Sequence, residues 1–384
     1  TEASGGVIQI FTKRGASGSA AWSMGVDYGI NNMGHIADPD IENGLWLNDC
    51  TDVTPGGDPA DFGPTACPNG DWLDNGFIQK YNLSVRGGSE VSNYFLSGSW
   101  GDERGVIDQA GYPGDDEGQT SWSVRGNFGF NPRDDLTIRF NNAFIHKDVD
   151  WIADGDKAEG FLLNVMRAGA GYTPNNENGL IFGMKLKTLT DHFTTGVNLV
   201  YTPLEGMTHR FNAGLDWAQN DYQEEHPYEY WRVPLGNREV DQYVTRKLTF
   251  DYAGTWDMSL TQDFTSQTSW GGQLYDDFIF RLDAFGYYFA GPGDKEVDSA
   301  ARTEAFETRR NITNGGFFIQ EMIGFRDKVF LTGGLRVDGH SSFGDDFGWA
   351  PYPKVSMSYV ISDETFWPES LGNMKLRSAF GESG

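Results

Sequence analysis

The residues of this chain that could carry chemistry are scattered, and none of them forms a known catalytic motif. The sequence contains no HExxH, no GxSxG and no phosphate-binding loop, and its 6 histidines show no metal-ligand spacing. His226 lies near Glu224, Glu225 and Glu229 and could belong to a metal cluster, but a solvated acidic loop is the favoured interpretation. We therefore expect no enzyme and no catalytic residues.

A second acidic group is a weak candidate for calcium binding. Asp38, Asp40 and Glu42 precede Gly44 in a pattern similar to a calcium loop. The glycine comes one position later than in an EF-hand, and the distal glutamate is absent. Apart from this loop calcium, we expect no cofactor and no metal site.

Binding through aromatic side chains is a better-supported chemistry. Flat rings beside carboxylates and amides can stack on sugar rings or peptide side chains, while the polar neighbours fix the orientation. The alternative is that these rings pack the loops against each other. The candidate residues are Trp46, Trp72, Trp151, Tyr172, Tyr228, Tyr230 and Trp231.

Cysteine usage and charge limit the setting. Cys50 and Cys67 lie in one polar segment, so a local disulfide in an oxidising compartment is favoured over two free thiols. The formal net charge of −26 makes nucleic acid an improbable partner. No apolar run is long enough for a membrane-spanning helix, although β-strands that span membranes are hidden from such averages.

Alternation of apolar and polar residues predicts strands throughout the chain. Trp22, Met24, Val26, Tyr28 and Ile30 fall on one side of an extended segment, and small or polar residues fall on the other. This pattern predicts a short strand near 5–13 and thirteen longer strands. Their ranges are 19–30, 76–87, 93–100, 121–131, 136–147, 193–203, 207–218, 244–256, 263–275, 313–325, 328–338, 351–361 and 374–381.

The connections between these strands alternate between long and short, and the acidic charge is found in the long ones. Long loops on one side and tight turns on the other are typical of outer-membrane barrels. Acidic residues outnumber basic ones in each of the six long segments, whereas the strands and short turns together are balanced. The long segments are 31–75, 101–120, 148–192, 219–243, 276–312 and 339–350.

The two faces of the strands also differ as in a barrel wall. The polar face is rich in Gly, Ser and Asn, which is typical of a lumen filled by water or a plug. Aromatic residues near the strand ends would form belts at the two membrane surfaces. These residues are Trp22, Tyr28, Trp100, Trp122, Phe144, Tyr201, Trp217, Trp256 and Trp270.

Four segments resemble one family of proteins. Residues 5–15, GGVIQIFTKRG, are similar to the end of the plug domain in TonB-dependent outer-membrane transporters. Residues 336–344, RVDGHSSFG, and 375–384, KLRSAFGESG, resemble runs of the SusC/RagA branch of that family. Residues 88–105 match its early hairpin. The resemblance extends over essentially the whole chain, in the right order.

This resemblance implies an all-β fold, a partial antiparallel transmembrane β-barrel of an expected 22-stranded plugged barrel. Residues 1–16 would be the C-terminal end of the plug, and residues 17–384 the N-terminal part of the barrel. The chain would be a fragment, without most of the plug and about nine strands. An integral protein of the bacterial outer membrane, with its long acidic loops outside, is the expected location.

The same resemblance implies active import of a large nutrient, a glycan or peptide oligomer. The implied partners are TonB with its ExbB/ExbD energy complex, a SusD-type surface lipoprotein and outer-membrane lipid. Three alternatives stay open at this stage: a siderophore or cobalamin receptor of the same superfamily, a passive porin-like barrel, and a secreted all-β binding or hydrolytic protein. The plug-like segment argues against the porin.

Overall fold

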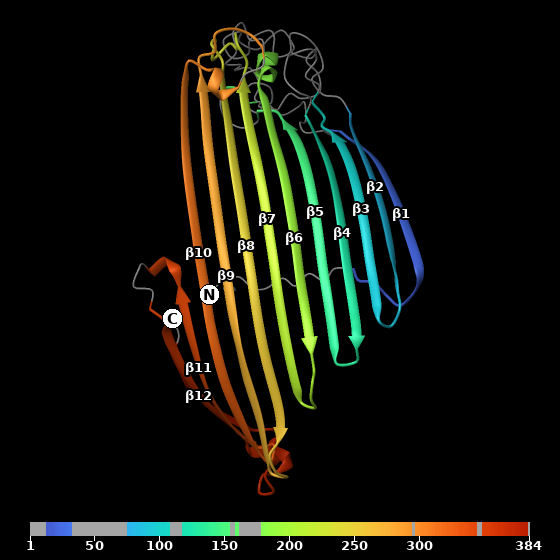
Figure 1. Ribbon diagram of the computed structural model, residues 1–384, viewed down its shortest axis with the longest axis vertical. Coiled ribbons are helices and arrows are strands. Elements are labelled where there is room, and N and C mark those ends of the chain that lie inside the picture. The colour runs from blue at the N-terminus through green and yellow to red at the C-terminus, as the bar shows by residue number, and fades with distance from the viewer. Residues whose placement is uncertain are drawn as a thin grey trace.

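A computed structural model describes residues 13–32, 75–107, 117–153, 158–160, 178–293, 296–343 and 348–382. Thirteen strands form one sheet, in which each strand pairs antiparallel with its neighbours in sequence (Figure 1). Among these residues no helix has the length and apolar character needed to cross a membrane. The expected all-β antiparallel fold is therefore confirmed, and the sheet is open, with β1 and β13 at its edges.

The strands vary in length across the sheet, and short 3-10 helices lie in the connections. The strands are β1 (Gly18–Asn31), β2 (Gly76–Gly88), β3 (Ser92–Arg104), β4 (Gly118–Arg133), β5 (Leu136–Trp151), β6 (Lys185–Tyr201), β7 (Met207–His226), β8 (Asn237–Ser259), β9 (Phe264–Tyr287), β10 (Arg302–Phe325), β11 (Val329–His340), β12 (Ala350–Val360) and β13 (Lys375–Gly381). The 3-10 helices are η3 (Asn178–Gly183), η4 (Val297–Ser299), η5 (Ser341–Phe343), η6 (Ile361–Asp363) and η7 (Glu369–Leu371).

The thirteen predicted strands are all present, but most of them extend further than expected at the end with the long connections. β8 has 23 residues, and β9 and β10 have 24 each. The expected long connection 276–312 was wrong in extent, because most of it continues β9 and begins β10. The strand expected near 5–13 lies largely outside the described residues, and residues 13–16 precede β1 without strand structure.

The two faces of the sheet have the polarity expected for a barrel wall. Met24 is 73% exposed and Ile319 is 57% exposed, although both are large and apolar. Strand register places such residues in rows on one face, which we call the outer face, and Gly, Ser, Asn and Arg on the opposite, inner face. An apolar band exposed along a whole sheet is stable only against lipid.

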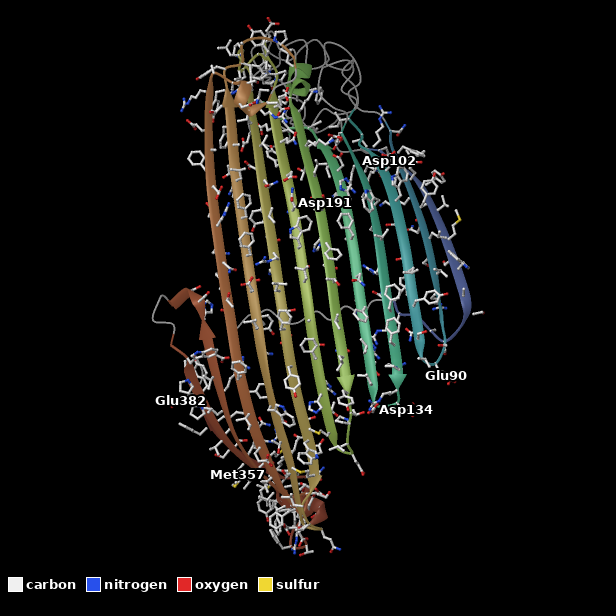
Figure 2. The ribbon with its side chains drawn as sticks, viewed as in Figure 1. Glu90, Asp102, Asp134, Asp191, Met357 and Glu382 are labelled. Atoms are coloured by element: carbon white, nitrogen blue, oxygen red, sulfur yellow. The ribbon has the colours of Figure 1, made fainter. Side chains whose placement is uncertain are left out.

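The outer face also shows where the bilayer ends. All nine aromatic residues predicted to lie at the membrane surfaces are on this face by register. Outward-facing ion pairs lie level with the upper aromatic residues, because the register places His146 opposite Trp122 and Arg246 opposite Trp217. His146 Nδ1 is 2.7 Å from Asp191 Oδ1, and Arg246 Nη2 is 3.1 Å from Asp276 Oδ1. Asp191 lies in the upper part of the wall in Figure 2. Charged pairs avoid hydrocarbon, so the bilayer ends below them.

The strands therefore rise well above the membrane. A barrel strand needs about 9–11 residues to cross a bilayer, whereas β9 has 24. Most turns at the other end of the sheet are short, apart from the connection between β12 and β13, and Glu90 and Asp134 mark two of the short ones in Figure 2. The wall thus has a lower half in lipid and an upper half in water, on the side of the long connections.

A charge on the outer face of the lower half should destabilise the barrel. We expect Ile319→Arg in the full-length protein to lower the free energy of unfolding by about 2–4 kcal/mol, because the guanidinium would face hydrocarbon. Folding into lipid vesicles in a urea series measures this. Its neighbour Gln320 faces inward, so Gln320→Arg should cost far less, and equal losses would contradict the assignment of the faces.

Candidate functional site

The inner face of the upper wall carries a group of carboxylates, which we call the mouth cluster: Glu224 of β7, Glu239 and Asp241 of β8, and Asp283 of β9. Strand register places Glu224 directly opposite Glu239, and Asp241 directly opposite Asp283. Two pairs of like charges thus face each other across adjacent strands, an arrangement that is usually destabilising. Sequence reasoning placed these residues in loops and missed the cluster.

Two of these carboxyls have raised pKa values. Burial, followed by the charge of Asp241, raises the pKa of Glu239. Burial, followed by the charge of Asp283 and a hydrogen bond with it, raises the pKa of Asp241. Arg281 partly offsets the charge, because its Nε lies 2.7 Å from Asp283 Oδ1 and its Nη2 lies 3.8 Å from Asp241 Oδ2. The cluster can accept hydrogen bonds from hydroxyl, amide or cationic groups of a ligand.

A small hydrophobic core lies on the inner face of the wall, next to the mouth cluster. Tyr230 is only 4% exposed and packs with Ala153, Met184 and Leu186. The ring centroids of Tyr230 and His226 lie 4.9 Å apart, edge to face. Burial raises the pKa of the Tyr230 phenol. The loop between β7 and β8, which carries Tyr230, is therefore packed against the inner face of the wall.

The structure describes four of the seven aromatic candidates and places Trp151, Tyr230 and Trp231 in or beside this core. Trp151 is 49% exposed, lies opposite Leu186 in the register, and its Nε1 donates to Thr188 Oγ1 at 3.0 Å. Tyr230 is buried and its ring lies 5.8 Å from that of Trp231, while Tyr228 is partly exposed. Trp46, Trp72 and Tyr172 lie outside the described residues. Tyr230 thus packs within the wall, as in the alternative of loop packing, whereas the ring of Trp151 is half exposed.

The acidic residues around His226 are divided between the two faces of the wall. Glu225 faces outward and accepts from Arg238 Nη1 at 3.1 Å, whereas Glu224 faces inward. His226 Nδ1 lies 2.6 Å from Asn237 Oδ1. Within the described ranges, no group of three or more His, Cys, Asp or Glu side chains is arranged to hold a metal. The calcium candidates Asp38, Asp40 and Glu42, and the cysteines Cys50 and Cys67, lie outside those ranges.

The segment before β1 lies against the inner face of the wall. Asn127 of β4, 4% exposed, donates from Nδ2 to the carbonyl oxygen of Lys13 at 2.8 Å. Gly15 approaches the backbone of Tyr94 so closely that any side chain there would overlap it. A hollow of about 540 Å³ adjoins this segment. Its inner-face lining includes Ser23, Asn82, Ser99, Ser123 and Arg125.

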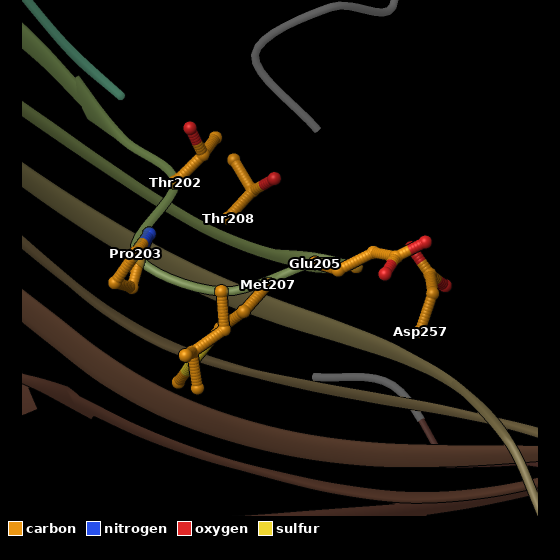
Figure 3. Close-up of a pocket in the computed structure, with 8 residues that line it drawn as sticks. Thr202, Pro203, Glu205, Met207, Thr208 and Asp257 are labelled. Atoms are coloured by element: carbon orange, nitrogen blue, oxygen red, sulfur yellow. The ribbon is translucent and has the colours of Figure 1, made fainter. Parts of the chain in front are cut away.

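A second hollow lies at the end of the wall with the short turns, in the turn between β6 and β7 (Figure 3). It has a volume of about 440 Å³ and is lined by Pro203, Glu205 and Asp257, among others. Gly206 adopts a positive φ of 73° there, and Asp257 N donates to its carbonyl oxygen at 2.9 Å. This hollow follows from the turn geometry and lies far from the mouth cluster.

The raised pKa of Asp241 predicts how the stability of the folded protein depends on pH. Because the folded protein binds this proton more tightly than the unfolded chain, Asp241 destabilises the fold as the pH rises from the ordinary carboxyl range through its raised pKa. We expect Asp241→Asn to raise the melting temperature of the full-length protein at about pH 7.5, and to have no effect at about pH 3, below the unfolded pKa.

Circular dichroism in detergent measures this difference, with Asp277→Asn as the control. Asp277 lies opposite Lys247 rather than another acid, so its neutralisation should not stabilise the protein at neutral pH. A stabilisation by Asp241→Asn that is equal at both pH values would show that burial and like charge are not its cause.

Comparison with known proteins agrees with the fold. Residues 236–383 match the family model described as TonB dependent receptor-like, beta-barrel. The chain is 24% identical over 361 residues to TonB-dependent receptor P26 of Formosa agariphila, a match that includes 84% of this chain and 34% of that protein. The chain thus spans about a third of the length of this curated relative.

Solved structures of a peptide transporter share the fold of nearly the whole chain. The RagAB peptide transporter aligns with 96% of this chain and 48% of its own, at 15% identity and a TM-score of 0.63. The RagAB peptide importer in its 'open-open' state aligns at 16% identity and a TM-score of 0.65. The match to the TonB-dependent receptor barrel places the wall in the bacterial outer membrane. The chain is thus similar in sequence to the barrel of TonB-dependent receptors and shares its fold with the barrel of the RagAB transporter.

Proposed function

We propose that the whole protein imports a large nutrient, a glycan or peptide oligomer, into the periplasm with energy supplied through TonB and the ExbB/ExbD complex. Residues 1–16 would be the end of the plug, and residues 17–384 part of the barrel around it. The protein would bind and move its cargo without making or breaking a bond in it.

The observation that carries this proposal is the contact between the inner wall and the segment before β1. The hydrogen bond from Asn127 to Lys13 holds that segment against the inner face of the wall, which is the contact expected if a plug precedes the first strand. A passive porin-like barrel has no need of such a segment. The small polar side chains around the adjoining hollow allow a plug to approach closely.

The proposed class of cargo is based on the residues at the upper end of the wall, around the mouth cluster. Carboxylates of the mouth cluster and the exposed ring of Trp151 provide hydrogen-bond acceptors beside an apolar surface, which suits an oligomer with amide or hydroxyl groups. The RagAB transporter, a peptide transporter, has a barrel with the same fold, which favours peptides here. A SusD-type surface lipoprotein would then cover the mouth.

Uptake by cells that produce the full-length protein tests this function. We expect accumulation of fluorescent peptide or glycan oligomers to be lost when TonB is deleted, and to fall severalfold in Trp151→Ala at an unchanged outer-membrane level. The lipid-facing Trp100→Ala serves as the matched control and should transport normally. Uptake that persists without TonB would indicate passive diffusion, and uptake of ferric siderophores alone would indicate a siderophore receptor.

A further inference from the structure

The height of the barrel wall changes abruptly between β10 and β11. β10 pairs with β9 along its whole length, from Arg302 to Phe325, but its pairing with β11 begins only at Asn314. β11 ends at His340, and the chain returns in β12 from Ala350. Figure 1 shows β10 reaching the top of the wall while β11 and β12 stay in its lower half. Within the described part of the chain, residues 302–312 therefore form a strand edge with no neighbouring strand on this side, which we call the upper β10 edge.

Two hydrogen bonds show which backbone groups face this edge. Arg326 N donates to Asp263 O at 2.7 Å, toward β9. Thr313 N donates to Ser341 Oγ at 2.8 Å, away from β9. The β9–β10 register is continuous between them, so even-numbered residues of β10 bond to β9 and odd-numbered residues face away. Facing away above Thr313 are the N–H and C=O groups of Thr303, Ala305, Glu307, Arg309 and Asn311.

These groups have no backbone partner among the described residues, and they lie above the bilayer. The outward ion pair of Arg246 and Asp276 marks the outer limit of the lipid, and Thr313 Oγ1 bonds to Asp276 Oδ2 at 2.8 Å. The edge above Thr313 is thus in water, where another polypeptide can reach it. A row of alternating donors and acceptors matches one ligand best, an extended backbone.

We propose that the upper β10 edge binds an extended segment of another cell-surface protein, which adds a strand to the wall above β11. The free groups point along the wall rather than into the lumen, so the added strand would fill the step in the wall. Transported cargo would instead have to follow the lumen, which these backbone groups do not face. This interaction is separate from the proposed import function.

Membrane orientation argues against a second copy of this chain as the occupant. Two copies in one membrane have the same orientation, so their β10 strands would run parallel. Two identical edges match their alternating donors and acceptors by two-fold symmetry when they pair antiparallel. Antiparallel pairing would require one copy to be inverted in the bilayer.

Side chains along the edge indicate the chemistry of the bound segment. Glu304 and Glu307 are paired with Arg302 and Arg309 within the same strand. Arg310 is exposed and has no ion pair in the described part of the chain. Phe306, on the same inner side as Arg310, is 58% exposed. The segment should therefore place an acidic residue opposite Arg310 and an apolar residue near Phe306.

Amide hydrogen exchange in native outer-membrane vesicles tests the proposal. We expect the amides of Ala305, Glu307 and Arg309 to exchange at least about tenfold more slowly in vesicles than in the purified receptor, because the partner is lost on purification. The amides of Thr308 and Arg310 bond to β9 and are internal controls that should be slow in both samples. Fast exchange in vesicles, or equal protection in the purified receptor, would overturn the proposal.

Variants and cross-linking identify the occupant. Glu307→Pro removes an N–H that faces away from β9 and should abolish the protection, whereas Glu307→Gln should retain it. A photo-cross-linker in place of Ala305 should join the receptor to a different polypeptide, with a yield about twofold to fivefold lower in Arg310→Glu. Cross-links to lipopolysaccharide, to a second receptor or to the receptor's own loops would each refute a partner strand.

Discussion

The structure depends on one constraint: inside a bilayer, each backbone N–H and C=O must find its hydrogen-bond partner within the protein. The chain meets it with thirteen strands that pair only with their sequence neighbours. The register shifts twice, near Gly18 and near Arg133, both at the end of the wall with the short turns. A continuous register keeps every second residue on the same face, so apolar residues meet lipid along the full width of the sheet.

The height of the wall then determines what the other residues can do. Above the lipid, the outer face carries paired charges, such as His146 with Asp191, which water can solvate. The inner face at the same height carries Asp241 opposite Asp283, an arrangement with a cost in stability. Residues that oppose stability without serving the fold are commonly functional. We therefore propose that the mouth cluster, rather than the lipid-facing band, is the surface that binds a ligand.

The sequence predicted the lower half of this wall well and the upper half poorly, for a physical reason. Where a strand crosses lipid, one face must be apolar, and alternation such as that of Trp22 and Met24 is visible. Above the lipid both faces meet water, so strand residues such as Arg238 to Gln242 look like a loop. A weaker period-2 signal remains there, because Val240 and Val244 alternate with Glu239, Asp241 and Tyr243. The mouth cluster could not be predicted, since its pairs depend on how far β7, β8 and β9 extend above the lipid and on the exact register between them.

The central claim is that one wall divides into a lipid-embedded half and a water-exposed half at a height near Thr313 of β10. Spin labels at successive positions of β10 in the full-length protein, in lipid bilayers, measure this directly through their accessibility to oxygen and to a water-soluble nickel complex. The account predicts oxygen accessibility that alternates with period 2 from about Gly315 to Ile323, highest at Phe317 and Ile319, and accessibility to nickel alone above Thr313. Alternating oxygen accessibility that continues up to Arg302, or none at Phe317 and Ile319, would contradict it.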